Sequence, residues 1–211
     1  MKETIIFDFN GTLIDDCNLC LDILNILTKE NNLAFVSKRK YKAVFDFPVQ
    51  RYYERCGFDV SNENFSKISA RFHQFYNQRS YSEVKAFKSA YSVLEHLKDK
   101  YQLVCLSASK QETLEKQLKY YNLYKYFDDV VGLDNIHAYS KMQVAIDYAT
   151  KNNLLDKKTY FIGDSIHDFE VASAINAKCI LISTGHTAKN RLKKVNDIVI
   201  DDLNELLNYL D

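Results

Sequence analysis

The sequence predicts an α/β fold, a doubly wound parallel sheet that carries a small all-helical cap domain. Two observations predict the sheet: short apolar runs recur along the chain, and segments with helical periodicity separate most of them. A third observation predicts the cap. About ninety residues separate the first apolar run from the second, far more than one crossover helix requires.

The apolar runs are bounded by turn residues and have the length of buried strands. They cover Thr4 to Phe9, Gln102 to Leu106, Asp129 to Val131, Thr159 to Ile162, Lys178 to Ser183 and Asp197 to Ile200. Short strands that alternate with helices imply right-handed crossovers and hence a parallel sheet. In such a sheet, functional groups gather at the carboxyl ends of the strands.

Three local patterns predict where helices begin. The segments Ser109 to Glu112 and Ser140 to Gln143 have the capping-box form, a hydroxyl residue followed three positions later by Glu or Gln. Pro48, the only proline, is expected to be the first residue of a cap helix.

The large insertion divides the chain into two domains. Residues 1–15 and 85–211 are expected to form the core, and residues 16–84 the helical cap. Helical spacing supports the cap assignment at its start, where the apolar residues are Leu19, Ile23, Leu24 and Leu27. Aromatic residues follow from Tyr41 to Tyr81, and the core is expected to resume near Phe87.

The composition excludes several classes of protein. Of the 211 residues, 46% are hydrophobic, enough for one core and a smaller insert. Lys and Arg total 28 against 28 Asp and Glu, so no net field attracts nucleic acid or an anionic membrane. The apolar stretch at the N-terminus is too short for a signal peptide or a membrane span.

Five scattered cysteines do not form the framework of a small secreted domain, and reduced thiols predict a cytoplasmic protein. Cys17 and Cys20 form a C-x-x-C pair, but no second pair completes a zinc site. We therefore expect this pair to pack on a helix face.

The strongest local signal is the segment from Ile5 to Asp15, IIFDFNGTLID, in which a buried strand ends in Asp8 and a glycine turn follows. A carboxylate there is held rigidly at the sheet edge, where it can attack phosphorus. The alternative is that Asp8 caps the following turn.

A second strand, from Tyr160, ends in Asp164, with Asp168 four residues further on. Oxygen ligands of this kind suit Mg²⁺, which prefers one or two carboxylates, waters and a substrate phosphate. The alternative is that Asp164 or Ser165 caps a helix.

Two further residues follow strands. Ser107 comes directly after a strand, so its hydroxyl and the next backbone N–H, that of Ala108, can bind phosphoryl oxygens. Lys141 opens the helix after the third strand, where its charge could reach the same group. Singly, neither residue is unusual at such a position.

Together these four motifs, centred on Asp8, Ser107, Lys141 and the Asp164–Asp168 pair, resemble the haloacid dehalogenase superfamily. The insertion lies where that superfamily carries its helical caps, and the core would be of the Rossmann-like type found there. The segment from Phe47 to Arg55 looks like the cap of phosphoglycolate-phosphatase-like members.

The resemblance implies a role for each matching residue. Asp8 would be the nucleophile that becomes an aspartyl-phosphate, and Ser107 and Lys141 would stabilise the transferring phosphoryl group. Mg²⁺ would be held by Asp8, Asp164 and the backbone carbonyl of Asn10. Asp168 would complete this metal site by orienting a bound water or Asp164.

The substrate is expected to be a small phosphorylated metabolite, acted on by a monomer or homodimer. Gly11 and Ala108 belong to the expected substrate-binding loops. Arg51 in the cap is the first candidate for contacting a substrate anion, since a guanidinium group binds carboxylate or phosphate with two hydrogen bonds. The alternative for Arg51 is a solvated position on a helix.

One position departs from the superfamily pattern. Its phosphatases usually carry Asp two residues after the nucleophile, as general acid and base, whereas this chain has Asn10. A carboxamide cannot deliver a proton to the leaving alkoxide, and general acid–base assistance contributes roughly 10²–10⁴-fold in rate.

Three explanations stay open: a leaving group that needs no acid, as in an acyl phosphate or a phosphonate-type substrate; another group such as His167; or a weak or inactive relative. A weak or unusual phosphatase ranks first, because the other motif residues are present.

The competing classes are weaker. A receiver domain of bacterial signalling also uses Asp, a hydroxyl residue and Lys around Mg²⁺, but it lacks a large insertion. Haloacid dehalogenation needs no metal and is disfavoured by Asp164 and Asp168. A catalytically silent binding or regulatory protein on the same fold is the main alternative, and Asn10 is its support.

Overall fold

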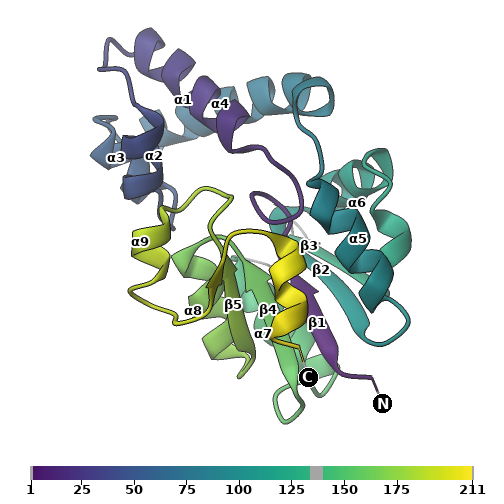
Figure 1. The fold of residues 1–211 in the computed structure, drawn as a ribbon. Coiled ribbons are helices and arrows are strands. Elements are labelled where there is room, and N and C mark those ends of the chain that lie inside the picture. The colour runs from purple at the N-terminus through teal and green to yellow at the C-terminus, as the bar shows by residue number, and fades with distance from the viewer. Residues whose placement is uncertain (1, 134–139, 211) are drawn as a thin grey trace.

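The computed structural model describes residues 2–133 and 140–210. Within them, six strands form one parallel sheet in the order β3-β2-β1-β4-β5-β6 (Figure 1). The fold class predicted from the sequence is confirmed. The strands are β1 Thr4–Phe7, β2 Gln102–Lys110, β3 Asp129–Leu133, β4 Thr159–Gly163, β5 Lys178–Ile182 and β6 Val199–Ile200.

Helices cover both faces of the sheet because the strands are apolar on both faces. In β1, Ile5 and Phe7 point to one buried cluster and Ile6 to the other, and all three are fully buried. The first cluster contains residues of α5 Lys88–Leu97, α6 Gln111–Tyr120 and η2 Leu203–Asn208, and the second those of α7 Lys141–Lys151, α8 Ile166–Ala174 and α9 Lys189–Leu192. The short helix η1 Tyr124–Tyr126 precedes β3.

Five helices lie between β1 and β2, and the first four of them lie above the sheet in Figure 1. These four are α1 Cys17–Glu30, α2 Lys38–Val44, α3 Gln50–Arg55 and α4 Asn62–Glu83. The apolar stripe of α1 is buried, as its spacing predicted, at Leu19, Ile23, Leu24 and Leu27. Cys17 and Cys20 are buried on the same helix.

The two connections between these helices and the sheet lie side by side. The N–H of Asp15 donates to the carbonyl of Lys85 at 2.9 Å, and the N–H of Phe87 donates to the carbonyl of Leu13 at 3.0 Å. Residues 13–15 and 85–87 thus form a short antiparallel pairing only a few residues after Asp8.

Of the three predicted helix starts, one is confirmed with its cap, one lies within the predicted segment but lacks the predicted cap, and one is displaced by two residues. Strand β2 continues to Lys110, which pairs with β3 beyond a register shift, so Ser109 lies in the strand and α6 begins at Gln111. Helix α3 begins at Gln50, two residues after Pro48. Ser140 caps α7 as predicted, because its hydroxyl accepts from the N–H of Gln143 at 3.2 Å.

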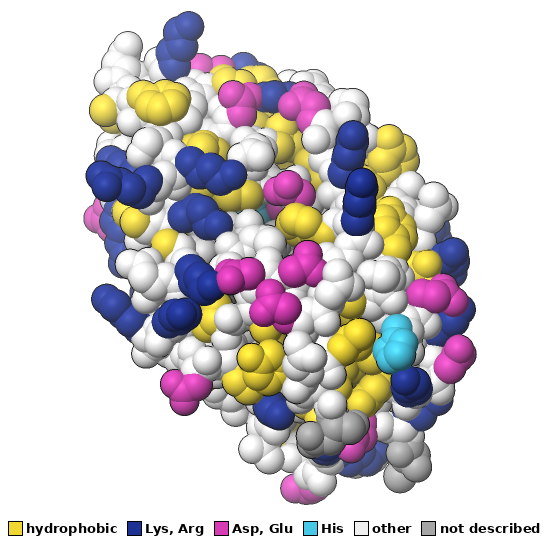
Figure 2. All heavy atoms as spheres, in the orientation of Figure 1, with side chains coloured by type: hydrophobic (Ala, Val, Ile, Leu, Met, Phe, Trp, Pro, Cys, Tyr) yellow, Lys and Arg dark blue, Asp and Glu magenta, His cyan; other side chains and the backbone are white. Residues whose placement is uncertain are grey.

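The charges on the visible surface agree with the balanced numbers of acidic and basic residues. The face in Figure 2 carries basic and acidic side chains interspersed with apolar ones. All five cysteines are free and buried. Among the helices of residues 2–133 and 140–210, none combines the length and apolarity that crossing a bilayer requires.

Candidate active site

Asp8 directly follows β1 at the carboxyl edge of the sheet, and only 6% of it is exposed. Its N–H donates to the carbonyl of Ile162 in β4 at 2.8 Å. One carboxylate oxygen accepts from the hydroxyl of Thr12 at 3.4 Å, and the other accepts from the ammonium group of Lys141. The sheet, the glycine turn and α7 therefore fix this carboxylate from three sides.

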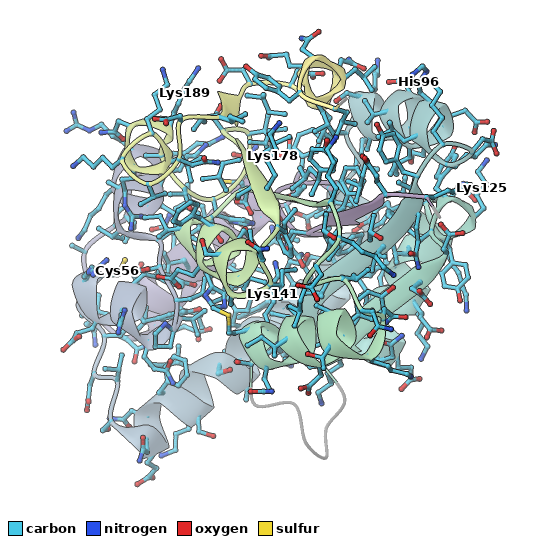
Figure 3. The ribbon with its side chains drawn as sticks, turned by 90° about the horizontal axis from the view of Figure 1, so that it is seen from below. Cys56, His96, Lys125, Lys141, Lys178 and Lys189 are labelled. Carbon is cyan, nitrogen blue, oxygen red and sulfur yellow. The ribbon has the colours of Figure 1, made fainter. Side chains whose placement is uncertain are left out.

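Lys141 is the first residue of α7 and lies next to α8, almost fully buried (Figure 3). Its Nζ donates to Asp8 Oδ1 and, at 2.6 Å, to Asp168 Oδ1. Burial alone would lower the pKa of Lys141, but the charges of Asp168 and Asp8 raise it above its usual value. Lys141 is therefore a permanent cation between two carboxylates.

Asp164 follows β4 and is packed against glycines. A Cβ atom added to Gly11 would lie 2.6 Å from Asp164 Oδ2, and one added to Gly185 would lie closer still. Only glycine fits at these two positions, and Gly11 also has a φ of +73°, which other residues rarely adopt. The N–H of His186 donates to the same Oδ2 atom. Asp164 is thus held in a tight backbone pocket.

Asp168 has protein donors for both of its oxygens. Oδ2 accepts from the N–H of Asp164 at 3.1 Å, from the N–H of Ser165 at 2.9 Å and from its hydroxyl at 2.7 Å, while Oδ1 accepts from Lys141. Burial raises the pKa of Asp168, but Lys141 and Ser165 together lower it below its usual value. This arrangement suits a residue that positions Asp164 and Lys141.

The carboxylates of Asp8, Asp164 and Asp168 gather around one point, with ligand atoms within 4.8 Å of one another, all buried. Burial raises the pKa of Asp8 more than Lys141 lowers it, and the other two carboxylates raise it further. The pKa of Asp164 is also raised, first by burial. Three buried carboxylates face one ammonium group, so a hard divalent cation fits this cluster and would favour the ionised nucleophile.

Asn10 is held by a carboxylate that the sequence motifs did not single out. Its Nδ2 donates to Asp16 Oδ2 at 2.8 Å and to the hydroxyl of Tyr76 at 2.9 Å. Its Oδ1 accepts from the hydroxyl of Ser109 at 3.4 Å. The N–H of Gly11 donates to Asp16 Oδ1 at 3.0 Å.

Asp16 forms a buried ion pair with His186, whose Nε2 lies 3.0 Å from Asp16 Oδ1. The other ring nitrogen of His186 lies 2.8 Å from the hydroxyl of Tyr41. Burial lowers the pKa of His186, but the charge of Asp16 raises it well above its usual value. Burial raises the pKa of Asp16, and His186 lowers it by more. Both partners are therefore charged near neutral pH.

Three further predicted residues, Ser107, Ala108 and Arg51, differ in how exposed they are to solvent. Ser107 is buried in β2, where its hydroxyl accepts from the N–H of Ser109 at 3.1 Å, and Ala108 beside it is exposed. Arg51 is exposed on α3, where its guanidinium group donates to the carbonyl of Phe47 at 3.4 Å, four residues earlier in the chain.

His167 stacks on an aromatic residue of the segment between α2 and α3. Its ring lies on Phe47 with a centroid distance of 5.0 Å, and its Nδ1 lies 3.1 Å from Glu170. The ring therefore connects the first turn of α8 to the segment that precedes α3.

Sequence reasoning missed Asp16, His186 and the two tyrosines. His186 follows the carboxyl end of β5 and could have been found by the same strand-end rule as Asp164. Asp16 had a weaker signal, its place at the predicted domain boundary. Nothing in the local sequence marks Tyr41 or Tyr76, because their contacts depend on how the cap helices dock.

Comparison with known proteins agrees with this geometry. A family described as haloacid dehalogenase-like hydrolase matches residues 5–182. The chain belongs to this family. It is an enzyme, a hydrolase of this family.

Relatives span the whole chain at low identity. A pyrophosphatase PpaX from Bacillus mycoides is 24% identical over 221 residues, covering 99% of this chain and 96% of the relative. A haloacid dehalogenase-like hydrolase from Streptococcus pneumoniae has a similar structure, with a TM-score of 0.84 at 20% identity, and the match covers 100% and 99% of the two chains. A predicted phosphoglycolate phosphatase from Haemophilus somnus has a TM-score of 0.77 at 17% identity, covering 99% and 97%. These structural likenesses support the fold.

Proposed function

We propose that this hydrolase is a Mg²⁺-dependent phosphatase that acts on a small phosphorylated metabolite through an aspartyl-phosphate on Asp8. The observation that carries the proposal is the buried cluster in which Asp8 meets Lys141, Asp164 and Asp168. A carboxylate fixed beside a cation and two further carboxylates suits phosphoryl transfer, which needs positioning and charge neutralisation.

The proposed reaction has two steps. A carboxylate oxygen of Asp8 attacks phosphorus, the bond from phosphorus to the leaving oxygen breaks, and the leaving group takes the electron pair. Water then attacks the phosphorus of the aspartyl-phosphate, which releases inorganic phosphate and restores Asp8. Lys141 neutralises charge on the nucleophile and the transferring group, and Asp168 holds Lys141 and Asp164 in place.

The proposed metal ligands are Asp8, Asp164 and the backbone carbonyl of Asn10. Bound Mg²⁺ would neutralise phosphoryl charge and keep Asp8 ionised. Ser107, with the backbone of Ala108, is proposed to bind phosphoryl oxygens at the end of β2. Arg51 is proposed as an anion contact on the cap.

Asn10 bears on the type of substrate. Because the carboxamide cannot protonate a leaving alkoxide, we propose a substrate whose leaving group is already a weak base, such as a phosphoanhydride or an acyl phosphate. The Bacillus relative is named a pyrophosphatase, and pyrophosphate belongs to this class.

The burial of the carboxylate cluster affects how a substrate can reach Asp8. Asp8, Lys141 and Asp164 are each at most 6% exposed beneath the four-helix segment. We propose that residues 16–84 act as a cap that opens to admit substrate and pivots at the paired connections 13–15 and 85–87. A cytoplasmic location is proposed from the reduced, buried cysteines.

A screen of phosphorylated metabolites with and without Mg²⁺ tests the proposal, with Asp8→Asn as the blank. It should include pyrophosphate, an acyl phosphate and an alkyl phosphate. We expect Mg²⁺-dependent release of phosphate by the wild type and none by the blank. Equal activity in both proteins would remove the proposed mechanism, and an inactive wild type that still binds phosphate would favour the silent binding protein that Asn10 leaves open.

A further inference from the structure

Asp16 stands at the N-cap position of α1 but does not cap that helix. An N-cap Asp ordinarily accepts a hydrogen bond from an N–H in the first helical turn, and the Asp16 side chain makes no such bond. Its carboxylate turns back toward the loop that follows the nucleophile. Asp16 is only 1% exposed. Its carboxylate makes contacts with distant parts of the chain in place of the usual contact within its own helix.

The carboxylate of Asp16 is surrounded by donors. Oδ1 accepts from the N–H of Gly11 at 3.0 Å and lies 3.0 Å from His186 Nε2. Oδ2 accepts from Asn10 Nδ2 and from the hydroxyl of Tyr76, each at 2.8 Å. The thiol of Cys20 is a fifth, more distant donor, 3.7 Å from Oδ2. Five donors on a buried, ionised carboxylate make a stiff arrangement, because each bond is charge-assisted.

Two of these donors, the side chain of Asn10 and the N–H of Gly11, belong to residues joined by one peptide bond. The carbonyl of Asn10 and the N–H of Gly11 belong to the same planar peptide group, so the direction of the N–H fixes the direction of the carbonyl. Asp16 holds this N–H and also the side chain of Asn10. The same N–H also donates to the carbonyl of Ile14 at 3.0 Å. The Asn10 carbonyl is the backbone ligand in the proposed metal site, and its orientation is therefore set by Asp16 together with this turn contact.

The same carboxylate reaches a second proposed ligand through His186. The ring of His186 pairs with Asp16, and the backbone N–H of His186 donates to Asp164 Oδ2. Two proposed metal ligands from distant parts of the chain are thus tied to one buried side chain.

The cap completes the arrangement. Tyr76, from α4, donates to Asp16, and Tyr41, from α2, lies 2.8 Å from His186 Nδ1. Asp16 is itself the first residue of the proposed cap, so if the cap pivots away, Asp16 separates from Asn10, Gly11 and His186. His186 then also loses Tyr41, the partner of its second nitrogen.

We propose that Asp16 is a positioning residue that orients the Asn10 carbonyl and, through His186, Asp164, so that metal affinity depends on docking of the cap. This inference rests on the proposed function, because it assumes a divalent cation at the carboxylate cluster. Side chains that orient metal ligands typically change affinity or activity by roughly 10- to 100-fold when they are replaced.

Titration with Mn²⁺, followed by the electron paramagnetic resonance of the free ion, measures metal binding without turnover. Asp16→Asn preserves size but replaces one acceptor oxygen by a donor NH₂, which must face a donor. We expect its dissociation constant for Mn²⁺ to rise about tenfold or more. Asp15→Asn, the same change at the exposed neighbouring residue, should bind like the wild type.

A kinetic comparison separates positioning from general damage to the fold. A positioning role predicts that Asp16→Asn needs more Mg²⁺ for half-maximal activity and recovers much of kcat at saturating Mg²⁺. A merely structural role predicts a lower kcat with unchanged half-saturation by Mg²⁺. A folded Asp16→Asn protein with wild-type affinity for Mn²⁺ would overturn the inference alone, whereas a wild type that binds no Mn²⁺ would overturn the proposed function as well.

Tyr76→Phe decides the matter if Asp16→Asn does not fold. This change removes only the hydroxyl that donates to Asp16 and accepts from Asn10. We expect binding of Mn²⁺ to weaken by about threefold, smaller than the full effect of losing an orienting residue. Unchanged affinity in the folded Tyr76→Phe protein would overturn the inference.

Discussion

Two buried clusters of acidic and basic side chains lie next to each other in this enzyme and differ in their charge balance. At the sheet edge, Asp8, Asp164 and Asp168 share one cation, Lys141. At the junction with the cap, Asp16 has His186 as its own counter-ion. The first cluster has an excess of negative charge and the second does not.

The difference in charge predicts a difference in role. Burial raises the pKa of Asp8, so its ionised form is costly until a cation arrives, whereas His186 and neighbouring donors lower the pKa of Asp16. Cys20 also lies near Asp16 and His186, but burial raises the pKa of its thiol well above its usual value, so it stays protonated. The sheet-edge cluster suits metal binding and reaction, and the junction cluster suits a fixed position.

The same substitution in the two clusters should therefore separate chemistry from structure. Asp8→Asn removes the nucleophile and should reduce kcat by at least roughly a thousandfold. Because the ionised Asp8 is costly in the metal-free protein, the melting temperature should stay the same or rise. Asp16→Asn should instead lower the melting temperature. Steady-state kinetics and thermal unfolding of both variants check this, and a less stable Asp8→Asn protein would break the comparison.

Loss of the shared cation should have the next largest effect. Lys141→Met leaves Asp8 and Asp168 buried without their ion-pair partner, which typically costs about 3–5 kcal/mol of unfolding free energy. Urea unfolding measures this cost, and turnover should also fall steeply. Lys151→Met, at the exposed end of the same helix, is the control. A similar small loss in both variants would contradict the proposed role of Lys141.

Placing an acid at position 10 should show how Asp16 affects the protonation of that position. Asn10→Asp would place a second carboxylate against Asp16, where the Asn10 amide now donates at 2.8 Å, and the repulsion would raise the pKa of the new group toward that of a useful acid. Turnover of an alkyl phosphate should rise, up to about 100-fold, and turnover of an aryl phosphate with a good leaving group should change little. No rise on the alkyl phosphate would make the missing-acid interpretation wrong.

The pH dependence of stability should be the smallest effect. Since the pKa values of Asp8 and Asp164 are raised in the folded protein, their contribution to stability is present below the ordinary carboxyl pKa of 3.8 and is lost as pH rises through their folded values. The metal-free protein should thus become less stable as pH rises above about 4, and Mg²⁺ should offset the loss. Thermal unfolding across pH with and without Mg²⁺ measures both. A metal-free protein that gains stability over this range would contradict the charge excess.

The sequence predicted the sheet-edge cluster because its signals are local. Each strand is an apolar run, and Asp8 and Asp164 follow their strands directly, so the rule about carboxyl ends brings them together. The failure at Ser109 has a long-range cause, the extra pairing of Lys110 with Leu133 in β3, which extends the strand past a good capping pattern.

The junction cluster could not be predicted in the same way. Asp16 and His186 are 170 residues apart, and the hydroxyl of Tyr76 reaches Asp16 only because α4 docks beside α1. No periodicity or spacing in the sequence encodes such a contact. The departure at Asn10 was visible in the sequence, but its partner Asp16 was not.

Rapid acid quench during turnover of a ³²P-labelled substrate, followed by peptide mapping, tests the central claim most directly. We expect a label on Asp8 that is labile to mild alkali, forms only with Mg²⁺ present and is absent from Asp8→Asn. Turnover with the label on another residue, or turnover by Asp8→Asn at the wild-type rate, would contradict it.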